Sequence, residues 1–157
     1  MPLVLTSPAF AAGAEIPRRH TCQGGDLSVP LAWSGVPADA RSLALIVEDP
    51  DAPDPAAPLF TWVHWILYNL PPTISALDEG VAIANLPPGA REGENDWKRT
   101  GYSGPCPPIG RHRYVHRLYA LDVVLPELGA VTRTTLLNVM KGHVLAQAEL
   151  VGTYVKR

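Results

Sequence analysis

Three stretches of the chain contain more consecutive apolar residues than a strand with one solvent-exposed face would contain. Residues 43–47 read LALIV before a Glu-Asp-Pro turn, residues 60–70 are rich in aromatic and β-branched side chains, and residues 114–125 run up to Pro126. None of these stretches alternates regularly with polar residues. The pattern therefore predicts strands that are covered on both faces, as in the middle of a sandwich.

Helical spacing is found near the C-terminus. Thr134 or Thr135 can cap a run of apolar residues at helical spacing, and Gly142 ends that run. Residues 143–154 return to strand character. One late helix among several strands favours an all-β-dominated fold with short peripheral helices, and 157 residues are enough for a single domain, 1–157.

Proline and glycine set the character of the connections. The chain has 17 prolines and 13 glycines without a fixed period, which indicates ordered, turn-rich loops. Residues 49–58 read DPDAPDPAAP, and each proline fixes its own φ and restricts the residue before it. We expect this loop to hold one shape, and a cis X-Pro bond is possible there at a base rate of about 5% per bond.

Charge and hydropathy exclude some classes of protein. A net charge of -2 and a pI of about 6.2 argue against nucleic-acid binding, which needs a basic surface, and the arginines at 111, 113 and 117 alternate with other residue types. No apolar run is long enough for a membrane span, and the N-terminus does not resemble a secretory signal. An initiator Met1 then favours a cytoplasmic location.

The two cysteines, Cys22 and Cys106, lie far apart in the sequence. They could form a disulfide only if the fold brought their Cα atoms within about 7 Å. In a cytoplasm they should be reduced, so we expect free thiols.

Polar residues able to do chemistry gather in three motifs. DPDAP at 49–53 presents two carboxylates at a strand end, and WVHW at 62–65 places Trp62 and His64 on one face. GYSGPCPPIGRHRY at 101–114 runs from a stiff loop into a strand. Taken singly, these are a turn, a core histidine and a rigid loop. Together, acids, histidines and a tyrosine at the ends of central strands indicate a site.

The three motifs in this order resemble the signature regions of the phosphatidylethanolamine-binding family, with the bacterial Raf kinase inhibitor-like branch as the nearest match. The likeness extends to HTCQG at 20–24, GENDW at 93–97 and the C-terminal strand, so it spans nearly the whole chain. One departure is Val29, where a second proline is usual.

This resemblance implies two antiparallel β-sheets in a sandwich and a small pocket near the surface. The implied ligand is phosphate, sulfate, acetate or a phosphoethanolamine-type head group, and no cofactor or metal is implied. The implied ligand-binding residues are Asp49, Asp51, Pro53, Trp62, His64, Gly104, Pro105, His112 and Tyr114, with Arg113 and Cys106 in support.

The chemistry of such a pocket has to accommodate two carboxylates beside an anion. Backbone N–H groups near Gly104 can form a nest, and His64 and His112 can donate hydrogen bonds, more strongly when protonated. We expect Arg113 to neutralise one aspartate from behind and the other to hold a histidine in its charged form. An aspartate kept protonated by burial, or one that receives a ligand ammonium, is the alternative. Charged histidines would tighten anion binding as the pH falls from about 8 to 6.

The leading function is therefore a non-enzymatic binding protein, with a protein kinase or other signalling enzyme as a possible partner. The alternative is a small hydrolase that uses the Asp/His cluster or Cys106 as nucleophile. A homodimer formed through Trp97 and the residues after Pro88 is also possible.

Overall fold

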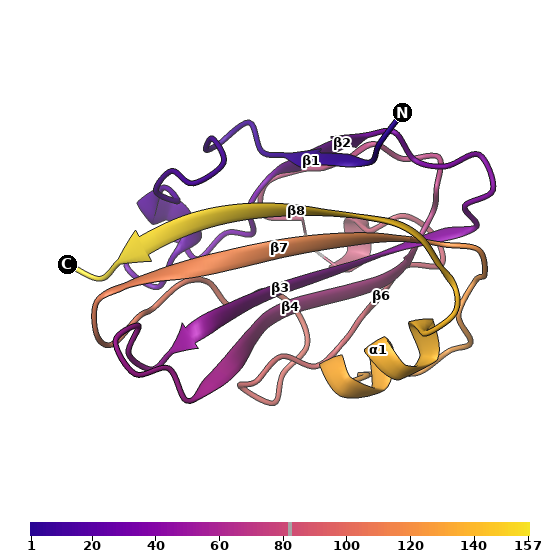
Figure 1. The fold of residues 1–157 in the computed structure, drawn as a ribbon. Helices are drawn as coiled ribbons and strands as arrows, with labels where there is room; N and C mark the ends of the chain where they lie inside the picture. Colours follow the sequence, from indigo (N-terminus) through magenta and orange to yellow (C-terminus); the bar gives the residue numbers. More distant parts are fainter. Residues whose placement is uncertain (82) are drawn as a thin grey trace.

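The computed structural model describes residues 1–81 and 83–157, and it is built mostly of β-strands (Figure 1). Five strands form a large antiparallel sheet in the order β6-β4-β3-β7-β8, and three form a small one in the order β1-β2-β5. The large sheet contains β3 (Ser42–Ala52), β4 (Phe60–Leu70), β6 (Arg91–Glu92), β7 (Arg111–Leu121) and β8 (Val144–Val155). The small sheet contains β1 (Val4–Thr6), β2 (Leu31–Ser34) and β5 (Ala76–Leu77). The predicted β-dominated fold with two antiparallel sheets is confirmed.

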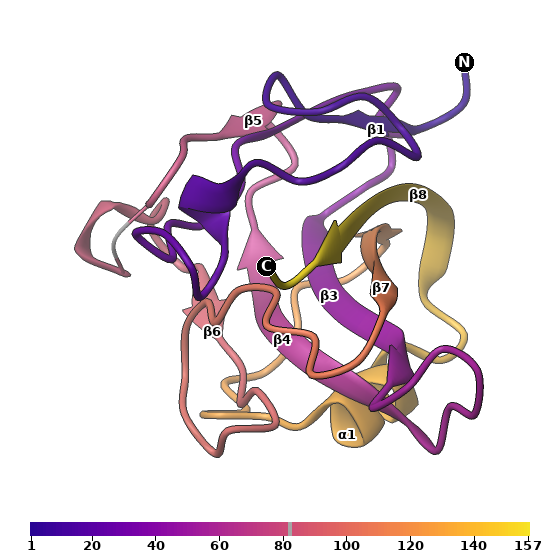
Figure 2. The ribbon, with the colours of Figure 1, turned by 90° about the vertical axis from the view of Figure 1, so that its left-hand side faces the viewer.

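Three layers are visible when the molecule is viewed along the large sheet (Figure 2). The small sheet covers one face of the large sheet, and helix α1 (Arg133–Met140) covers the other. Each face has its own hydrophobic cluster, and the first eight residues of β3 are buried; Leu43, Leu45 and Val47 pack in one cluster and Ala44 and Ile46 in the other. This confirms that the long apolar runs are strands covered on both sides.

The ends of two elements differ from the prediction. Helix α1 is capped by Thr132, whose side chain accepts a hydrogen bond from the backbone N–H of Thr135, so the cap lies before the predicted threonines. Strand β7 covers Arg111–Leu121 and not 114–125, because its pairing with β8 already starts at Arg111 and the chain turns after Leu121. Two short 3-10 helices, Arg18–His20 and Ile83–Asn85, complete the fold.

The end of β3 is irregular where the acidic motif lies. The register between β3 and β4 shifts between Val47 and Glu48 and again between Asp49 and Ala52. Asp49 lies opposite Trp62, and the Ala52–Pro53 peptide bond is cis. These shifts aim the two aspartates in different directions, which decides their roles below.

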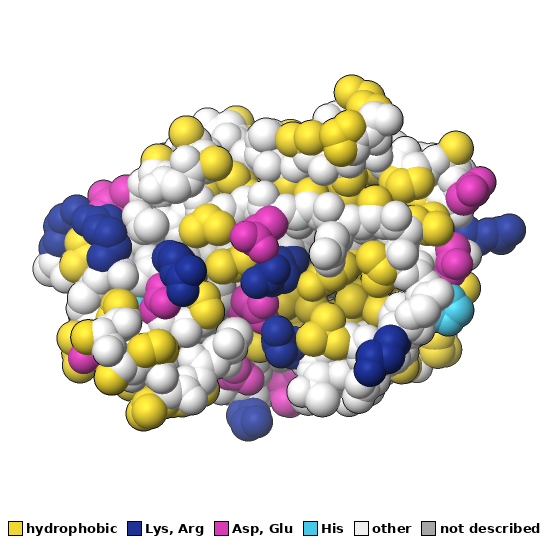
Figure 3. All heavy atoms as spheres, in the orientation of Figure 1, with side chains coloured by type: hydrophobic (Ala, Val, Ile, Leu, Met, Phe, Trp, Pro, Cys, Tyr) yellow, Lys and Arg dark blue, Asp and Glu magenta, His cyan; other side chains and the backbone are white. Residues whose placement is uncertain are grey.

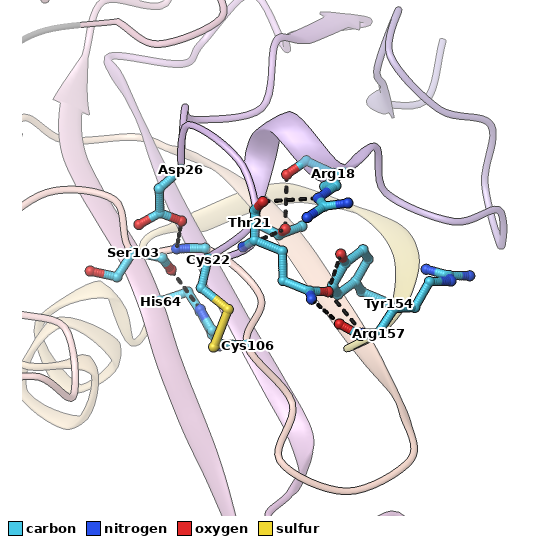
Figure 4. The surroundings of a disulfide bond; sticks show 11 residues. Arg18, Thr21, Cys22, Asp26, His64, Ser103, Cys106, Tyr154 and Arg157 are labelled. Carbon is cyan, nitrogen blue, oxygen red and sulfur yellow. Dashed lines mark hydrogen bonds between the residues drawn. A yellow bond between two sulfur atoms is a disulfide. The ribbon is translucent and has the colours of Figure 1, made fainter.

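The cysteines form a disulfide, so the expectation of free thiols is wrong. The Cα atoms of Cys22 and Cys106 are 5.4 Å apart across 84 positions of sequence. The backbone N–H of Cys22 also donates to the carbonyl oxygen of Pro105 at 3.1 Å. The loop after residue 101 therefore packs directly on the N-terminal segment around residues 18–26 (Figure 4).

Charged groups are paired on the face in front of the viewer in Figure 1. Figure 3 shows Lys and Arg side chains of this face lying close to Asp and Glu side chains, with apolar atoms between them. Buried Glu48 pairs with Arg133 and with Arg117, and Arg117 also reaches Glu149. Such mixed charge is not the surface that tracks a phosphate backbone. None of the helices in the described part of the chain is long and apolar enough to cross a membrane.

Candidate functional site

Segments that are remote in sequence meet at one opening. They enclose a cavity of about 230 Å³ between the ends of β3, β4 and β7, the loop that carries Trp97 and the proline-rich loop before β7. The structure therefore brings the three motifs together, as the sequence predicts. The cavity is lined by Asp49, Ala52, Pro53, Phe60, Trp62, His64, Trp97, Cys106, Pro107, Pro108, His112 and Tyr114.

Asp49 and His112 form a hydrogen-bonded pair in the lining of this cavity. Oδ2 of Asp49 lies 2.5 Å from Nδ1 of His112, and Oδ1 accepts from the backbone N–H of Asp51 at 2.8 Å. Nε2 of His112 lies 2.8 Å from the carbonyl oxygen of Ile109, and a carbonyl can only accept, so Nε2 carries a hydrogen.

One further proton is therefore shared between Asp49 and Nδ1 of His112. Burial raises the pKa of Asp49, and the hydrogen bond from His112 opposes that rise. Whether the proton resides on the imidazole or on the carboxyl, the pair has no net charge. Its ring nitrogens are both engaged, so His112 is not the hydrogen-bond donor to a ligand that we predicted.

Asp51 points away from the cavity and is neutralised from behind, as predicted. Arg113 Nε and Nη2 donate to the two carboxylate oxygens of Asp51 at 3.0 and 2.8 Å, and the backbone N–H of Arg113 donates to Oδ2 at 2.8 Å. These hydrogen bonds from Arg113 lower the pKa of Asp51. Asp51 and Arg113 therefore support the cavity wall and do not line it.

His64 reaches the cavity from β4 with a fixed tautomer. Its Nδ1 lies 2.6 Å from the carbonyl oxygen of Ser103 and must donate to it. Burial lowers the pKa of His64 to about 4, so the ring is neutral at pH 7 and Nε2 is a bare acceptor. The prediction that a charged His64 donates to an anion between pH 8 and 6 is therefore not supported by the structure.

Tyr114 offers the second free polar group. Burial raises the pKa of its hydroxyl, which stays protonated and can donate. The buried side-chain polar atoms that lack a partner in the described residues are His20 Nε2 and Ser28 Oγ. No hydrogen bond to His64 Nε2 or to the Tyr114 hydroxyl is found in the described chain. These two atoms nevertheless do not belong to the enclosed atoms without a partner, because both face the cavity.

Gly104 and Pro105 lie outside the cavity lining. The N–H of Gly104 donates to Asp26 Oδ1 at 2.9 Å, so it is not free to form the predicted anion nest. A Cβ at this position would lie 2.1 Å from the carbonyl oxygen of His20, which explains why glycine is needed. Both residues hold the loop against the N-terminal segment, Gly104 through Asp26 and Pro105 through its carbonyl oxygen, which accepts from the N–H of Cys22.

Cys106 lines the cavity between Pro105 and Pro107, and its sulfur is bonded to Cys22. The disulfide therefore links the part of the cavity wall formed by Pro107 and Pro108 to the segment around residue 22, close to His64 and Ser103 (Figure 4). It also removes the thiol on which a cysteine nucleophile would depend.

Trp97 lines the cavity, a position that the sequence analysis did not predict for it. Its ring meets Trp62 edge-on at 5.5 Å and His64 at 5.0 Å between centroids. Asn95 positions it, because Asn95 Oδ1 accepts from the N–H of Trp97 at 3.0 Å in a turn in which Lys98 has a φ of 63°. The GENDW motif was a signal for this residue, but only the fold shows that it faces the cavity.

The cavity therefore combines apolar walls with few polar groups. Among the described residues that line it there is no lysine or arginine. No group of three or more His, Cys, Asp or Glu side chains in the described chain could hold a metal ion.

Comparison with known proteins agrees with this fold. The model of the family described as phosphatidylethanolamine-binding protein matches residues 6–155, so the chain belongs to that family. A UPF0098 protein of Chlamydia muridarum is 51% identical over 150 residues, covering 96% of this chain and 97% of its own. A UPF0098 protein of Methanothermobacter thermautotrophicus is 48% identical over 151 residues, covering 96% and 97%.

Two solved structures extend the likeness. The crystal structure of a putative phosphatidylethanolamine-binding protein homolog from Chlamydia trachomatis has a TM-score of 0.91 at 48% identity and covers 99% of both chains. Escherichia coli YbcL, described as a new member of the mammalian family, has a TM-score of 0.89 at 30% identity and covers 100% of both chains.

Proposed function

We propose that this chain is a non-enzymatic binding protein whose cavity takes a small anionic ligand. The observation that carries the proposal is the cavity itself, in which three separate motifs enclose about 230 Å³ and leave His64 Nε2 and the Tyr114 hydroxyl unengaged. Concave, largely apolar sites with a few convergent polar groups are typical of ligand pockets.

Electrostatics allow an anion to enter despite the two aspartates. Arg113 neutralises Asp51 from the far side, and the proton shared by Asp49 and His112 removes the second negative charge. The Tyr114 hydroxyl can then donate to a ligand oxygen without a competing carboxylate in the cavity.

The proposal includes phosphate, sulfate, acetate, a phospholipid head group of the phosphoethanolamine type and a phosphorylated partner as candidate ligands. From the family resemblance alone, we also propose that the protein regulates a kinase or another signalling enzyme. Homodimer formation and a cytoplasmic location stay predictions, to be checked by gel filtration and by localisation of a tagged chain.

The hydrolase alternative has less support, because Cys106 and His112 are both engaged by other groups and His64 Nε2 is the cavity histidine nitrogen that stays free among the described residues. Cys106 is held in the disulfide, and Nε2 of His112 is engaged by the Ile109 carbonyl while Nδ1 is engaged by Asp49. A base with both nitrogens occupied cannot take a proton from a substrate in the cavity.

Ligand-induced stabilisation tests the proposal. Phosphate at about 100 times its dissociation constant should raise the free energy of unfolding by about 2.7 kcal/mol. Tyr114→Phe should weaken this effect, whereas Tyr119→Phe should preserve it, because Tyr119 lies on the same strand but packs in the cluster beside α1. If phosphate, sulfate and acetate all leave the unfolding transition unchanged, the proposed function is wrong.

A further inference from the structure

We infer that the cavity takes its ligand in a protonated form, with a ligand O–H or N–H that donates to Nε2 of His64. The class of ligand is a protonated oxyacid, such as dihydrogen phosphate or the monoanion of a phosphomonoester, in preference to a fully ionised oxyanion. This inference rests on the proposed function, which it makes more specific.

The first step is the tautomer of His64. Nδ1 is 2.6 Å from the Ser103 carbonyl oxygen, and the N–H of Ser103 donates back to the His64 carbonyl oxygen at 3.2 Å. These reciprocal hydrogen bonds fix the ring relative to the loop. Since a carbonyl oxygen only accepts, the hydrogen of a neutral His64 resides on Nδ1, and Nε2 presents a lone pair to the cavity.

The second step is that nothing around the ring favours a second proton enough to overcome its burial. His64 is 3% exposed, and the rings of Trp97 and Tyr114 pack edge-on against it. From β7, His112 and His116 disfavour a positive charge, while the carbonyl groups of Ser103 and Gly104 favour one.

Burial is the largest of these effects, and the pKa of His64 falls to about 4. The carboxylate among the described lining residues, Asp49, is engaged by His112 and by the N–H of Asp51. The lone pair on Nε2 therefore persists throughout the neutral and mildly acidic range.

The third step is that the other side-chain polar groups of the cavity, apart from the Tyr114 hydroxyl, already have hydrogen-bond partners, whereas His64 Nε2 has none in the described chain. Both ring nitrogens of His112 and both oxygens of Asp49 have partners. The Tyr114 hydroxyl remains, and it can donate to a ligand oxygen. A ligand that both donates and accepts satisfies the two free groups at once, whereas an oxyanion without a proton leaves Nε2 buried against negative charge.

Ligand charge points in the same direction. The described residues that line the cavity include no lysine or arginine to balance a second negative charge. A monoanion with an O–H fits this surrounding better than a dianion. A lipid phosphodiester carries no O–H, so it would need another donor, such as its ammonium group, to reach His64.

Calorimetric titration at pH 5.5 separates these possibilities. Phosphate is then a monoanion with O–H groups, methyl sulfate is a monoanion without one, and sulfate is a dianion without one. We expect phosphate to bind about 10-fold more tightly than methyl sulfate, since about 1.4 kcal/mol for one hydrogen bond corresponds to that ratio, and sulfate to bind more weakly still. Dimethyl phosphate, the phosphodiester of a lipid head group, should behave like methyl sulfate.

Two variants assign the preference to His64. His64→Asn retains an amide N–H that can reach the Ser103 carbonyl but has no acceptor at the position of Nε2, so the ratio between phosphate and methyl sulfate should fall to about 1 to 2. Tyr114→Phe should weaken both probes by a similar factor, because its hydroxyl donates to either. Thermal unfolding of each variant checks that the fold is retained.

The outcomes distinguish the inference from the function on which it rests. Equal binding of phosphate, methyl sulfate and sulfate to the wild-type protein overturns the inference and leaves the proposed function intact. An unchanged phosphate preference in folded His64→Asn also overturns it. If none of the probes binds at millimolar concentration, the proposed function and the inference fail together.

Discussion

Two buried histidines should make the fold sensitive to mild acid. His64 is 3% exposed and His116 is 1% exposed, and burial lowers the pKa of each from 6.5 to about 4. The unfolded chain binds protons at these positions near pH 6.5, whereas the folded protein resists them until about pH 4. The stability that this difference represents is present above pH 6.5 and is lost as the pH falls towards 4.

The magnitude follows from the two pKa values. At pH 5 nearly all unfolded histidine is protonated and most folded His64 and His116 is not, which costs about 2 kcal/mol per histidine relative to pH 7. Asp49 contributes in the opposite sense, because burial raises its pKa above that of the unfolded chain. The contribution of one histidine is therefore best isolated with a variant.

Urea unfolding at pH 7, 6 and 5 measures this effect. His116→Asn retains an N–H that can reach the carbonyl oxygens of Tyr114 and Leu150, which lie 3.1 and 3.2 Å from Nδ1 of His116. The variant should lose less stability than the wild-type protein between pH 7 and 5, by about 2 kcal/mol. Parallel pH dependences in the two proteins would refute the reasoning, because they would show that His116 accepts a proton in the folded state.

Three other changes should lower stability by separate mechanisms. Arg113→Met should reduce the free energy of unfolding in urea by about 1 to 2 kcal/mol, because it leaves buried Asp51 without its partly exposed guanidinium, and adding Asp51→Asn should recover part of the loss; no recovery would contradict the pairing. Reducing the bond between Cys22 and Cys106, which are 84 positions apart, should cost about 4.5 kcal/mol in guanidinium unfolding by the chain-entropy relation, and equal midpoints with and without dithiothreitol would contradict this. Glu48→Gln should lower the thermal midpoint because two arginines lose their carboxylate, and a raised midpoint would show that burying the carboxylate costs more than the pairs return.

The strands of the large sheet could be predicted from the sequence because burial on both faces leaves a distinct pattern. The apolar runs at 43–47 and 60–70 correspond to β3 and β4, and residues 143–154 to β8. The ends of helix α1 and strand β7 could not be predicted in this way, because the cap at Thr132 and the start of β7 at Arg111 depend on pairing and turns and not on local hydrophobicity.

The site was predictable in its segments but not in its hydrogen bonds. Acids and histidines at strand ends indicated where the chain converges, and strand alternation placed Arg113 behind one of the two aspartates, which the structure identifies as Asp51. The tautomer of His64 is fixed by the Ser103 carbonyl, 39 positions away in sequence, and no local pattern reports such a contact.

The disulfide and Trp97 were missed for a related reason. Two cysteines 84 positions apart carry no information about their distance until the loops are packed. Trp97 lies in a polar turn whose geometry is fixed by Asn95, and only the assembled fold turns its ring over Trp62.

A crystal grown at about pH 5.5 with phosphate would test the central claim most directly. The account predicts electron density for one phosphate in the cavity, with one oxygen about 2.7–3.0 Å from His64 Nε2 and another within hydrogen-bond distance of the Tyr114 hydroxyl. A cavity that stays free of phosphate while the ion binds elsewhere on the surface would contradict it.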